Sequence, residues 1–176
     1  MRRPARPLSD GRVALRAWRE ADAPAMVAAL ADPEIPRWTR VPSPYTARHA
    51  REFLRRGDEL EMSFAIVEAA GDGAILGGIG LRDLGDGVGQ LGYWVAAGAR
   101  RRGVASDALR LLAGWALEEA GMGRVQVLAS VGNRSSQRTA LRAGFEREGV
   151  LRGYLGYRGH REDAVIFGRV AAETNR

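Results

Sequence analysis

A short turn of arginine, glycine and small residues, Arg100 to Ala105, has the composition of an anion-binding site. It follows a segment patterned as a strand and leads directly into the most strongly patterned helical segment, Val104 to Ala120. The N–H groups in the first turn of a helix have no partner inside the helix, and the macrodipole adds partial positive charge there. Gly103 lets a ligand approach the backbone closely because it has no Cβ, and Ala105 keeps the next turn open. The turn is therefore predicted to hold a pyrophosphate group.

The overall composition narrows the class of protein. The chain has 176 residues, of which 45% are hydrophobic and 27% charged, as expected of one globular domain with a substantial core. Cysteine is absent, and the two histidines, His49 and His160, lie far apart in sequence, so no metal site is predicted. The N-terminus lacks the apolar run of a signal peptide, and no stretch approaches the ~20 apolar residues of a membrane span. We therefore expect a cytoplasmic protein with no membrane partner.

The positive charge comes entirely from arginine. All 27 cationic residues are arginines, and the net charge is +6. A GC-rich genome explains most of this bias, and binding of a phosphate-rich partner is the functional interpretation, because guanidinium groups pair bidentately with phosphate. Aromatic residues are not interleaved with the arginines and no nucleic-acid-binding motif is present, so nucleic acid ranks low as a direct ligand.

Hydrophobic periodicity and turn residues predict an α+β domain built on one mixed sheet. Strands are predicted at residues 13–16, 62–68, 74–83, 89–95 and 124–131, with a turn at 71–73 and a closing hairpin, 145–157 and 162–170, around Gly159. Helices are predicted at residues 20–31, 47–56, 104–120 and 134–143, and the proline-rich segment from Ile35 to Tyr45 is predicted to be an ordered loop. The helix at 104–120 is expected to bury one face, made of Ala105, Ala108, Leu109, Leu112, Trp115 and Ala116.

The turn also matches a known signature. Arg100-x-x-Gly103-x-Ala105 fits the pattern Q/R-x-x-G-x-G/A, the acetyl-CoA pyrophosphate signature of the GNAT superfamily. Its surroundings agree, because the turn follows Gly92-Tyr93-Trp94 and precedes Asn133-Arg134-Ser135-Ser136 and Ala143-Gly144-Phe145. Together with Leu15 to Trp18, these motifs resemble the branch of the superfamily that contains the RimJ and RimL type of ribosomal-protein N-terminal acetyltransferase.

The resemblance covers nearly the whole chain and implies a fold. The GNAT fold would be a single mixed, mostly antiparallel sheet of about seven strands with about four helices. The domain would occupy residues 8–172, between a disordered basic lead-in at residues 1–7 and a tail at residues 173–176.

The resemblance also implies acetyl-CoA as co-substrate, with no metal. Backbone N–H groups of the turn would hold the pyrophosphate, and the end of the preceding strand at Trp94-Val95 would offer backbone groups to the pantetheine arm. Asn133 would cap its helix or bond the pantetheine amides, and Arg138 would reach the nucleotide phosphate or lie on the surface. The residues that this assigns to the cofactor are Trp94, Val95, Arg100, Arg101, Arg102, Gly103, Val104, Ala105, Asn133 and Arg138.

The catalytic groups are implied less directly. Many members carry a tyrosine that protonates the leaving thiolate, but that position is Ala140 here, and the RimJ/RimL pattern N-x-x-S instead points to Ser136. Two positions that carry a glutamate in relatives are Gln90 and Leu155 in this chain, so neither supplies the base. Glu148 is our first choice for it, against the alternative of a surface carboxylate paired with an arginine. The other candidates are Asp83, Glu34, His49 and Tyr154 acting through water, and water alone is a further possibility.

The acceptor is the least determined part of the prediction. Trp38 and Tyr154 are predicted to contact the amine acceptor, since each lies in a segment that would border the site. The favoured acceptor is a protein N-terminal amine, with an antibiotic, amino acid or polyamine as the small-molecule alternative. A non-catalytic acyl-CoA-binding module is the second alternative, because the expected glutamates are missing. The closing hairpin is a possible homodimer contact.

Overall fold

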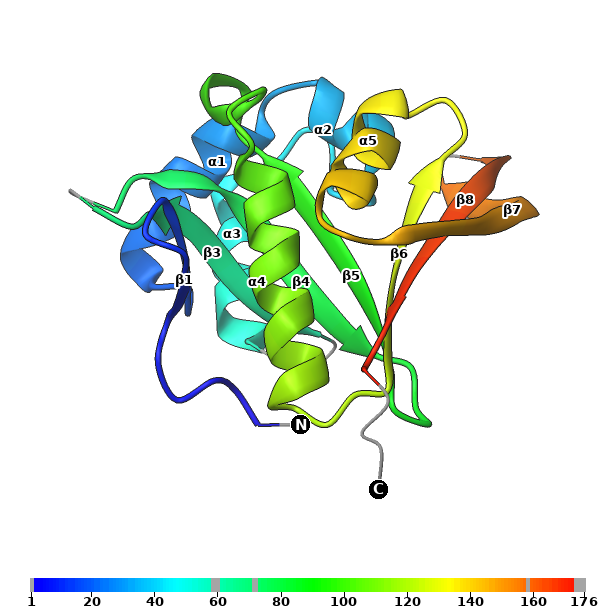
Figure 1. Cartoon of the computed structure of the whole chain (residues 1–176). Helices are drawn as coiled ribbons and strands as arrows, with labels where there is room; N and C mark the ends of the chain where they lie inside the picture. The colour runs from blue at the N-terminus through cyan, green and yellow to red at the C-terminus, as the bar shows by residue number, and fades with distance from the viewer. Residues whose placement is uncertain (1, 58–60, 71–72, 158, 173–176) are drawn as a thin grey trace.

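The computed structural model describes residues 2–57, 61–70, 73–157 and 159–172. These residues form one open sheet of eight strands in the order β1-β2-β3-β4-β5-β6-β8-β7 (Figure 1). The strands are β1 (Leu8–Ser9), β2 (Val13–Arg16), β3 (Met62–Glu68), β4 (Ile75–Asp83), β5 (Val88–Val95), β6 (Arg124–Ser130), β7 (Glu146–Tyr157) and β8 (His160–Val170). The α-helices are α1 (Ala23–Leu30), α2 (Glu34–Trp38), α3 (Ala47–Arg56), α4 (Val104–Glu118) and α5 (Arg134–Arg142). The predicted fold class is confirmed, with eight strands and five α-helices in the described residues.

The sheet opens in its middle, between β5 and β6. This pair is parallel, whereas the other neighbouring strands are antiparallel. Pairing between β5 and β6 ends at Leu91 and Val127, although β5 runs on to Val95 and β6 to Ser130. The two strand ends beyond Leu91 and Val127 therefore border a gap in the sheet, which we call the central gap.

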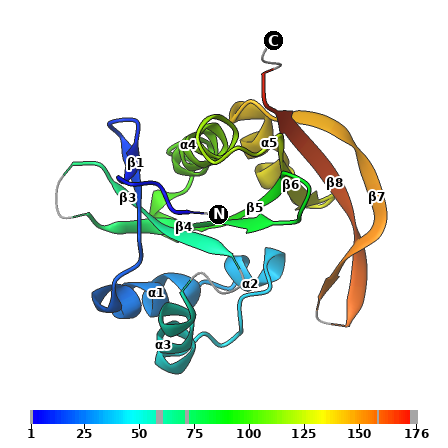
Figure 2. The same cartoon turned by 90° about the horizontal axis from the view of Figure 1, so that it is seen from below.

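The helices cover the two faces of the sheet separately. Helices α4 and α5 lie on one face, and α1, α2 and α3 lie on the other (Figure 2). Each side has its own core, with α4 packed in the larger cluster and Met26, Leu30, Ile35 and Ala50 in the smaller one. The expected buried face of α4 is confirmed at Ala108, Leu109, Leu112, Trp115 and Ala116, whereas Ala105 is only half-buried. The half-buried residue lies in the first turn, where the helix approaches the proposed ligand.

Two predicted segments differ from the observed structure. The segment from Ile35 to Tyr45 is not wholly a loop, because its first residues belong to α2. Pro36 fits there because a first-turn residue needs no N–H donor, and its ring and Ile35 are buried. The helix predicted at residues 20–31 divides into a 3-10 turn, Glu20–Asp22, and α1. Residues 71 and 72 of the predicted 71–73 turn lie outside the described residues.

The N-terminal segment contacts the sheet. Leu8 and Ser9 pair with Leu15 and Ala14 as a short edge strand that the sequence did not predict. Arg3 donates a hydrogen bond to the Ser63 carbonyl over 2.8 Å. The domain boundaries proposed from the sequence remain predictions.

A buried ion pair fixes the start of α1 against β2. Asp22 accepts hydrogen bonds from both Nη atoms of Arg16, at 2.7 and 2.9 Å, and from the Arg19 N–H. Burial alone would raise the pKa of the Asp22 carboxyl, but these hydrogen bonds outweigh it and hold the pKa below its ordinary value of 3.8. Asp22 therefore contributes stability above about pH 4, and this contribution is lost as the pH falls through the native pKa.

The variant Asp22→Asn is expected to lower the free energy of unfolding by about 2–3 kcal/mol at pH 7, since it leaves Arg16 without its counter-ion. The difference from wild type should shrink below pH 4, where the wild-type carboxylate is itself being protonated. Urea denaturation at pH 7 and pH 3.5 measures both effects, with the exposed Glu20→Gln as control. Equal stability of Asp22→Asn and wild type at pH 7 would contradict this role.

Candidate active site

The predicted pyrophosphate turn has the backbone conformation of an anion site. Arg101 has a positive φ of 60°, and Gly103, the residue before α4, has φ of 82°. Within the described part of the chain, no side chain caps the N-terminus of α4. The Gly103 carbonyl accepts hydrogen bonds from Ser106 Oγ and the Asp107 N–H, so the chain is already helical at this point. The first-turn N–H groups are thus left to bind an anion.

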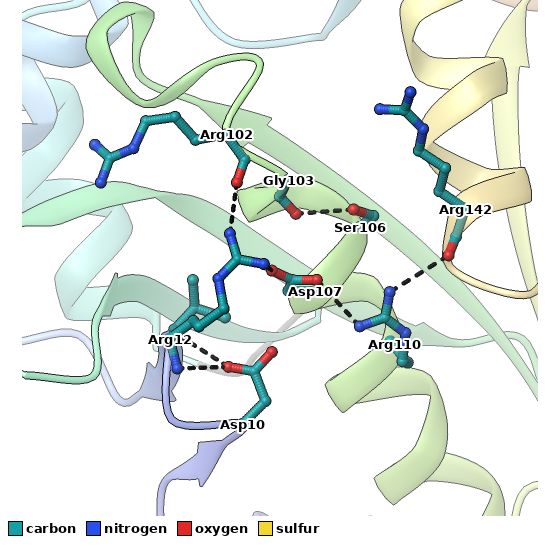
Figure 3. Close-up of polar contacts among 9 residues, drawn as sticks. Asp10, Arg12, Arg102, Gly103, Ser106, Asp107, Arg110 and Arg142 are labelled. Carbon is teal, nitrogen blue, oxygen red and sulfur yellow. Dashed lines mark hydrogen bonds and ion pairs between the residues drawn. The ribbon is translucent and has the colours of Figure 1, made fainter.

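Arg12, from the loop before β2, fixes the orientation of this turn (Figure 3). Its Nη2 donates to the Arg102 carbonyl over 2.8 Å, and its Nη1 lies 3.1 Å from Oδ2 of the buried Asp107. In a planar trans peptide the C=O and the next N–H point in opposite directions. Holding the Arg102 carbonyl toward Arg12 therefore turns the Gly103 N–H away from it.

Removal of this contact is expected to weaken CoA binding selectively. Arg12→Met should raise the Kd for acetyl-CoA about fivefold, the size expected for one net hydrogen bond. The Kd for acetyl-pantetheine, which lacks the pyrophosphate, should not change. Calorimetric titration measures both, and Arg48→Met on α3 is the control, since Arg48 is exposed and pairs with Glu52 of the same helix. Equal losses of affinity for the two thioesters would indicate a general defect instead.

The arginine side chains of the turn contact mainly the protein itself. Arg100 donates from Nε to the Val95 carbonyl over 3.2 Å and pairs with Asp32 at 2.6 Å. Arg102 pairs with Glu68 at 2.9 Å, and Arg101 is exposed. These contacts favour the backbone N–H groups, rather than the guanidinium groups, as the main anion ligands.

The strand that borders the central gap presents alternate residues to the two faces of the sheet. Trp94 stacks on Trp18, with ring centroids 6.3 Å apart, in the cluster below α1 and α3. Its neighbours Tyr93 and Val95 pack with the core on the α4 side. A contact of Trp94 with the pantetheine arm would therefore be made by its backbone.

Tyr93 and Ser136 form a pair of hydroxyls on the α4 and α5 side. Asn133 caps α5 by accepting a hydrogen bond from the Ser136 N–H over 3.0 Å, which confirms its predicted capping role. The Ser136 Oγ lies 2.9 Å from the Tyr93 hydroxyl. Burial raises the pKa of the Tyr93 phenol, while hydrogen bonds with Ser136 and Thr139 oppose the increase. Tyr93 was not among the predicted site residues, yet it brings a phenol beside Ser136.

The structure also shows how far Ala140 and Arg138 are buried. Ala140, where many relatives carry a tyrosine, is fully buried in the core. Arg138 is exposed on α5. The assignment of Arg138 to the nucleotide phosphate stays a prediction.

Glu148 is held in an ion pair away from the end of β6 that borders the gap. It accepts two hydrogen bonds from Arg124, at 2.7 and 2.5 Å, and these hold its pKa below the ordinary value. Arg124 is the first residue of β6, whereas Ser130 is the last. The geometry therefore favours the alternative weighed for Glu148, a surface carboxylate paired with arginine, with Arg124 as the partner.

A groove of about 450 Å³ lies between α2 and the start of β8. Its lining residues are Pro33, Pro36, Arg37, Trp38, Ser43, His160 and Glu162. Trp38 is the last residue of α2 and lines this groove, with Arg37 4.8 Å above its ring, and its contact with an acceptor stays a prediction. Tyr154 is not among the residues that line this groove and is 51% exposed, so its acceptor role stays a prediction.

Glu162 lines this groove and, like Tyr93, was not among the predicted site residues. The β7–β8 hairpin pairs Tyr157 with His160 and Leu155 with Glu162. This register places Glu162 directly across from Leu155, the position where a glutamate was expected. Paired residues on neighbouring strands point to the same face of the sheet. Glu162 on β8 therefore places a carboxylate beside Leu155 of β7.

The sequence also matches a family model. The model described as an acetyltransferase (GNAT) domain matches residues 12–146. The chain belongs to the GNAT acetyltransferase family. This confirms the resemblance inferred from the turn and from the motifs around it.

Two relatives from Bacillus subtilis (strain 168) are similar over part or most of the chain. The first carries the name "Putative ribosomal N-acetyltransferase YdaF" and is 35% identical over 105 residues, which cover 58% of this chain and 57% of YdaF. The second, the uncharacterized N-acetyltransferase YoaA, is 25% identical over 174 residues, covering 91% of this chain and 94% of YoaA. The match to YdaF thus spans little more than half of that protein.

Solved structures of GNAT acetyltransferases share the fold. RimJ of Mycobacterium smegmatis in complex with CoA-disulfide has a TM-score of 0.76 and 24% identity, covering 97% of this chain and 88% of its own. RimL, a ribosomal L7/L12 α-N-protein acetyltransferase in complex with coenzyme A, has a TM-score of 0.80 and 18% identity, covering 94% and 97%. At these identities the likeness concerns the fold alone.

In the described ranges, no cluster of three or more acidic or histidine side chains is arranged to hold a metal ion. No helix in those ranges is long and apolar enough to cross a membrane.

Proposed function

We propose that this GNAT protein transfers the acetyl group of acetyl-CoA to a primary amine by direct attack within a ternary complex. The observation that carries the proposal is the central gap, which has different chemical groups on its two faces. The uncapped N-terminus of α4 and the Tyr93–Ser136 hydroxyl pair lie on one face. The groove beside α2, with Trp38 and Glu162, belongs to the other.

This division fits the two halves of an acyl transfer. The pyrophosphate would bind the N–H groups of Gly103 and the first turn of α4, so that the pantetheine arm extends along the free edge of β5. The thioester would then lie in the gap, with its sulfur toward Ser136 and its carbonyl carbon open to the α2 side. The amine would attack from the groove, and the thiolate would accept a proton from the hydroxyl pair.

A protein N-terminal amine is the acceptor that we favour. The names of YdaF and RimL support it, since the first refers to a ribosomal N-acetyltransferase and the second to acetylation of a ribosomal protein. The groove is also larger than a bare amine needs, and its proline and tryptophan walls can pack against the residues that follow an N-terminus. A small amine is the second candidate acceptor.

An acceptor screen tests the proposal. Acetyl-CoA is incubated with the protein and with short peptides of varied N-terminal residues, polyamines, aminoglycosides and amino acids. Thiol release measures the rate, and mass spectrometry locates the acetyl group. We expect release that depends on an amine, with acetylation of an α-amine. CoA binding without turnover on any amine would favour a non-catalytic acyl-CoA-binding module.

A further inference from the structure

Glu162 is held at the wall of the groove by contacts to both carboxylate oxygens. Oε2 accepts a hydrogen bond from Ser130 Oγ over 2.5 Å, and Oε1 lies 3.2 Å from His160 Nε2. Ser130 is only 6% exposed, and its Oγ also accepts a hydrogen bond from the Gly132 N–H. The Glu162 side chain remains 32% exposed, so it is anchored on the buried side and accessible from the groove.

The strand register places this carboxylate on the face opposite the hydroxyl pair. Gln90 on β5 pairs with Gln126 on β6, so these two side chains point to the same face of the sheet. Ser130 lies an even number of residues after Gln126 on β6 and therefore points to that face as well. Ala164 pairs with Ser130, and Glu162 is two residues from Ala164 on β8. Tyr93 lies an odd number of residues from Gln90 and therefore points to the other face.

Ser130 also brings the carboxylate to the central gap itself. It is the last residue of β6, three residues beyond Val127, where pairing with β5 ends. Glu162 is thus bonded to the strand end that borders the gap, whereas Glu148 is bonded to Arg124 at the far end of the same strand.

We infer that Glu162 is the general base of the acetyl transfer, anchored by Ser130 as a positioning residue. The inference rests on the proposed function. The carboxylate accepts one proton from the ammonium group of the acceptor, and the freed nitrogen lone pair attacks the thioester carbon. The C–N bond forms and the C–S bond breaks, with the sulfur leaving as a thiolate. As the tetrahedral intermediate collapses, its nitrogen loses a second proton, and the thiolate takes one from the hydroxyl pair. One of the two protons lost from nitrogen restores the hydroxyl pair and the other is released, so the products are the amide, the CoA thiol and one proton.

The charged groups around Glu162 are compatible with this role. His160 lies on the same strand, and Arg37 of α2 lines the same groove. Arg37 lies over the Trp38 ring and forms an ion pair with Glu34 at 3.2 Å. A cationic amine that enters the groove therefore meets the carboxylate of Glu162, which is the acidic residue of the lining.

The test uses the full chain with tetra-alanine amide as the acceptor probe. An α-amine has a pKa near 8, so about a tenth of it is already neutral at pH 7. Glu162→Gln should therefore lower kcat about tenfold at pH 7 and approach the wild-type rate at pH 9, with the Kd for CoA unchanged. Ser130→Ala, which keeps the carboxylate but removes its anchor, should show a smaller loss with the same recovery at pH 9. Glu52→Gln on the surface of α3 is the matched control.

The possible outcomes separate the inference from the proposed function. A loss in Glu162→Gln that persists at pH 9, or no loss at pH 7, overturns the role of Glu162 while the proposed function stands. If Glu162→Gln fails to fold, Ser130→Ala decides by the same comparison of pH 7 with pH 9. A fall in rate in Glu148→Gln, with Glu162→Gln unaffected, would transfer the role to Glu148. If neither the probe nor any amine in the screen is acetylated by wild type, the proposed function fails together with the inference.

Discussion

Gly103→Trp is expected to abolish binding of CoA while leaving the sheet and α4 folded. The glycine has φ of 82° at the N-terminus of α4, where the atoms nearest to an added Cβ belong to Arg12 and Asp107 and lie at 3.6 Å or more. The Cβ itself therefore fits, but the indole ring would fill the space in front of the first-turn N–H groups. Losing two charge-assisted hydrogen bonds to phosphate corresponds to a loss of at least about a hundredfold in affinity.

A matched glycine separates ligand exclusion from backbone strain. Gly121 has φ of 76° just past the other end of α4, with no heavy atom within 4 Å of an added Cβ. Gly121→Trp should carry a similar conformational cost of about 1–2 kcal/mol and keep normal CoA affinity. Calorimetry with CoA and thermal unfolding of both variants provide the comparison. Undiminished CoA binding in a folded Gly103→Trp variant would refute the assignment of the turn.

Ser136→Ala is expected to lower kcat about a hundredfold while changing the Kd for acetyl-CoA less than twofold. The Ser136 hydroxyl bonds the Tyr93 hydroxyl over 2.9 Å, so the two form a unit that can donate to a leaving thiolate. Removing one donor that acts mainly in the transition state typically costs on the order of a hundredfold in kcat. Tyr93→Phe should have a similar effect, and the double variant should be little worse than either single variant.

Ser135→Ala is the natural control for this prediction. Ser135 is the exposed neighbour of Ser136 on α5, with the same side chain and the same helix propensity. Steady-state rates with the best acceptor of the screen measure the change in kcat, and CoA titrations measure the change in Kd. If Ser136→Ala retains wild-type kcat, or if its defect lies in CoA affinity, the hydroxyl pair has no part in protonating the thiolate.

The local features of the fold and the turn could be predicted because they depend on residues close in sequence. Helix α4 begins where a glycine with left-handed φ follows the arginines, and its buried face repeats at helical spacing. The proline-rich segment was harder, because Pro36 is compatible with a loop and with a first helical turn. Burial of Ile35 and Pro36 decides in favour of α2, and burial depends on distant elements.

The candidate site was predicted less completely, because its side chains meet across the sheet. Nothing local to Glu148 shows that Arg124 binds it, since the two are 24 residues apart. Alternation along β5 separates the faces of Tyr93 and Trp94, but only the position of α5 shows that Tyr93 meets Ser136. Glu162 was missed because counting outward from Gly159 pairs Leu155 with Asp163, one residue away from the partner that the structure shows.

Initial-rate kinetics test the central claim, that acetyl transfers directly between the two faces of the gap. Thiol release is measured while acetyl-CoA is varied at several fixed concentrations of the best amine acceptor. Direct attack in a ternary complex predicts double-reciprocal lines that intersect, and no acetylated enzyme in a mixture without amine. Parallel lines, with an acetyl group found covalently on the protein by mass spectrometry, would contradict the account.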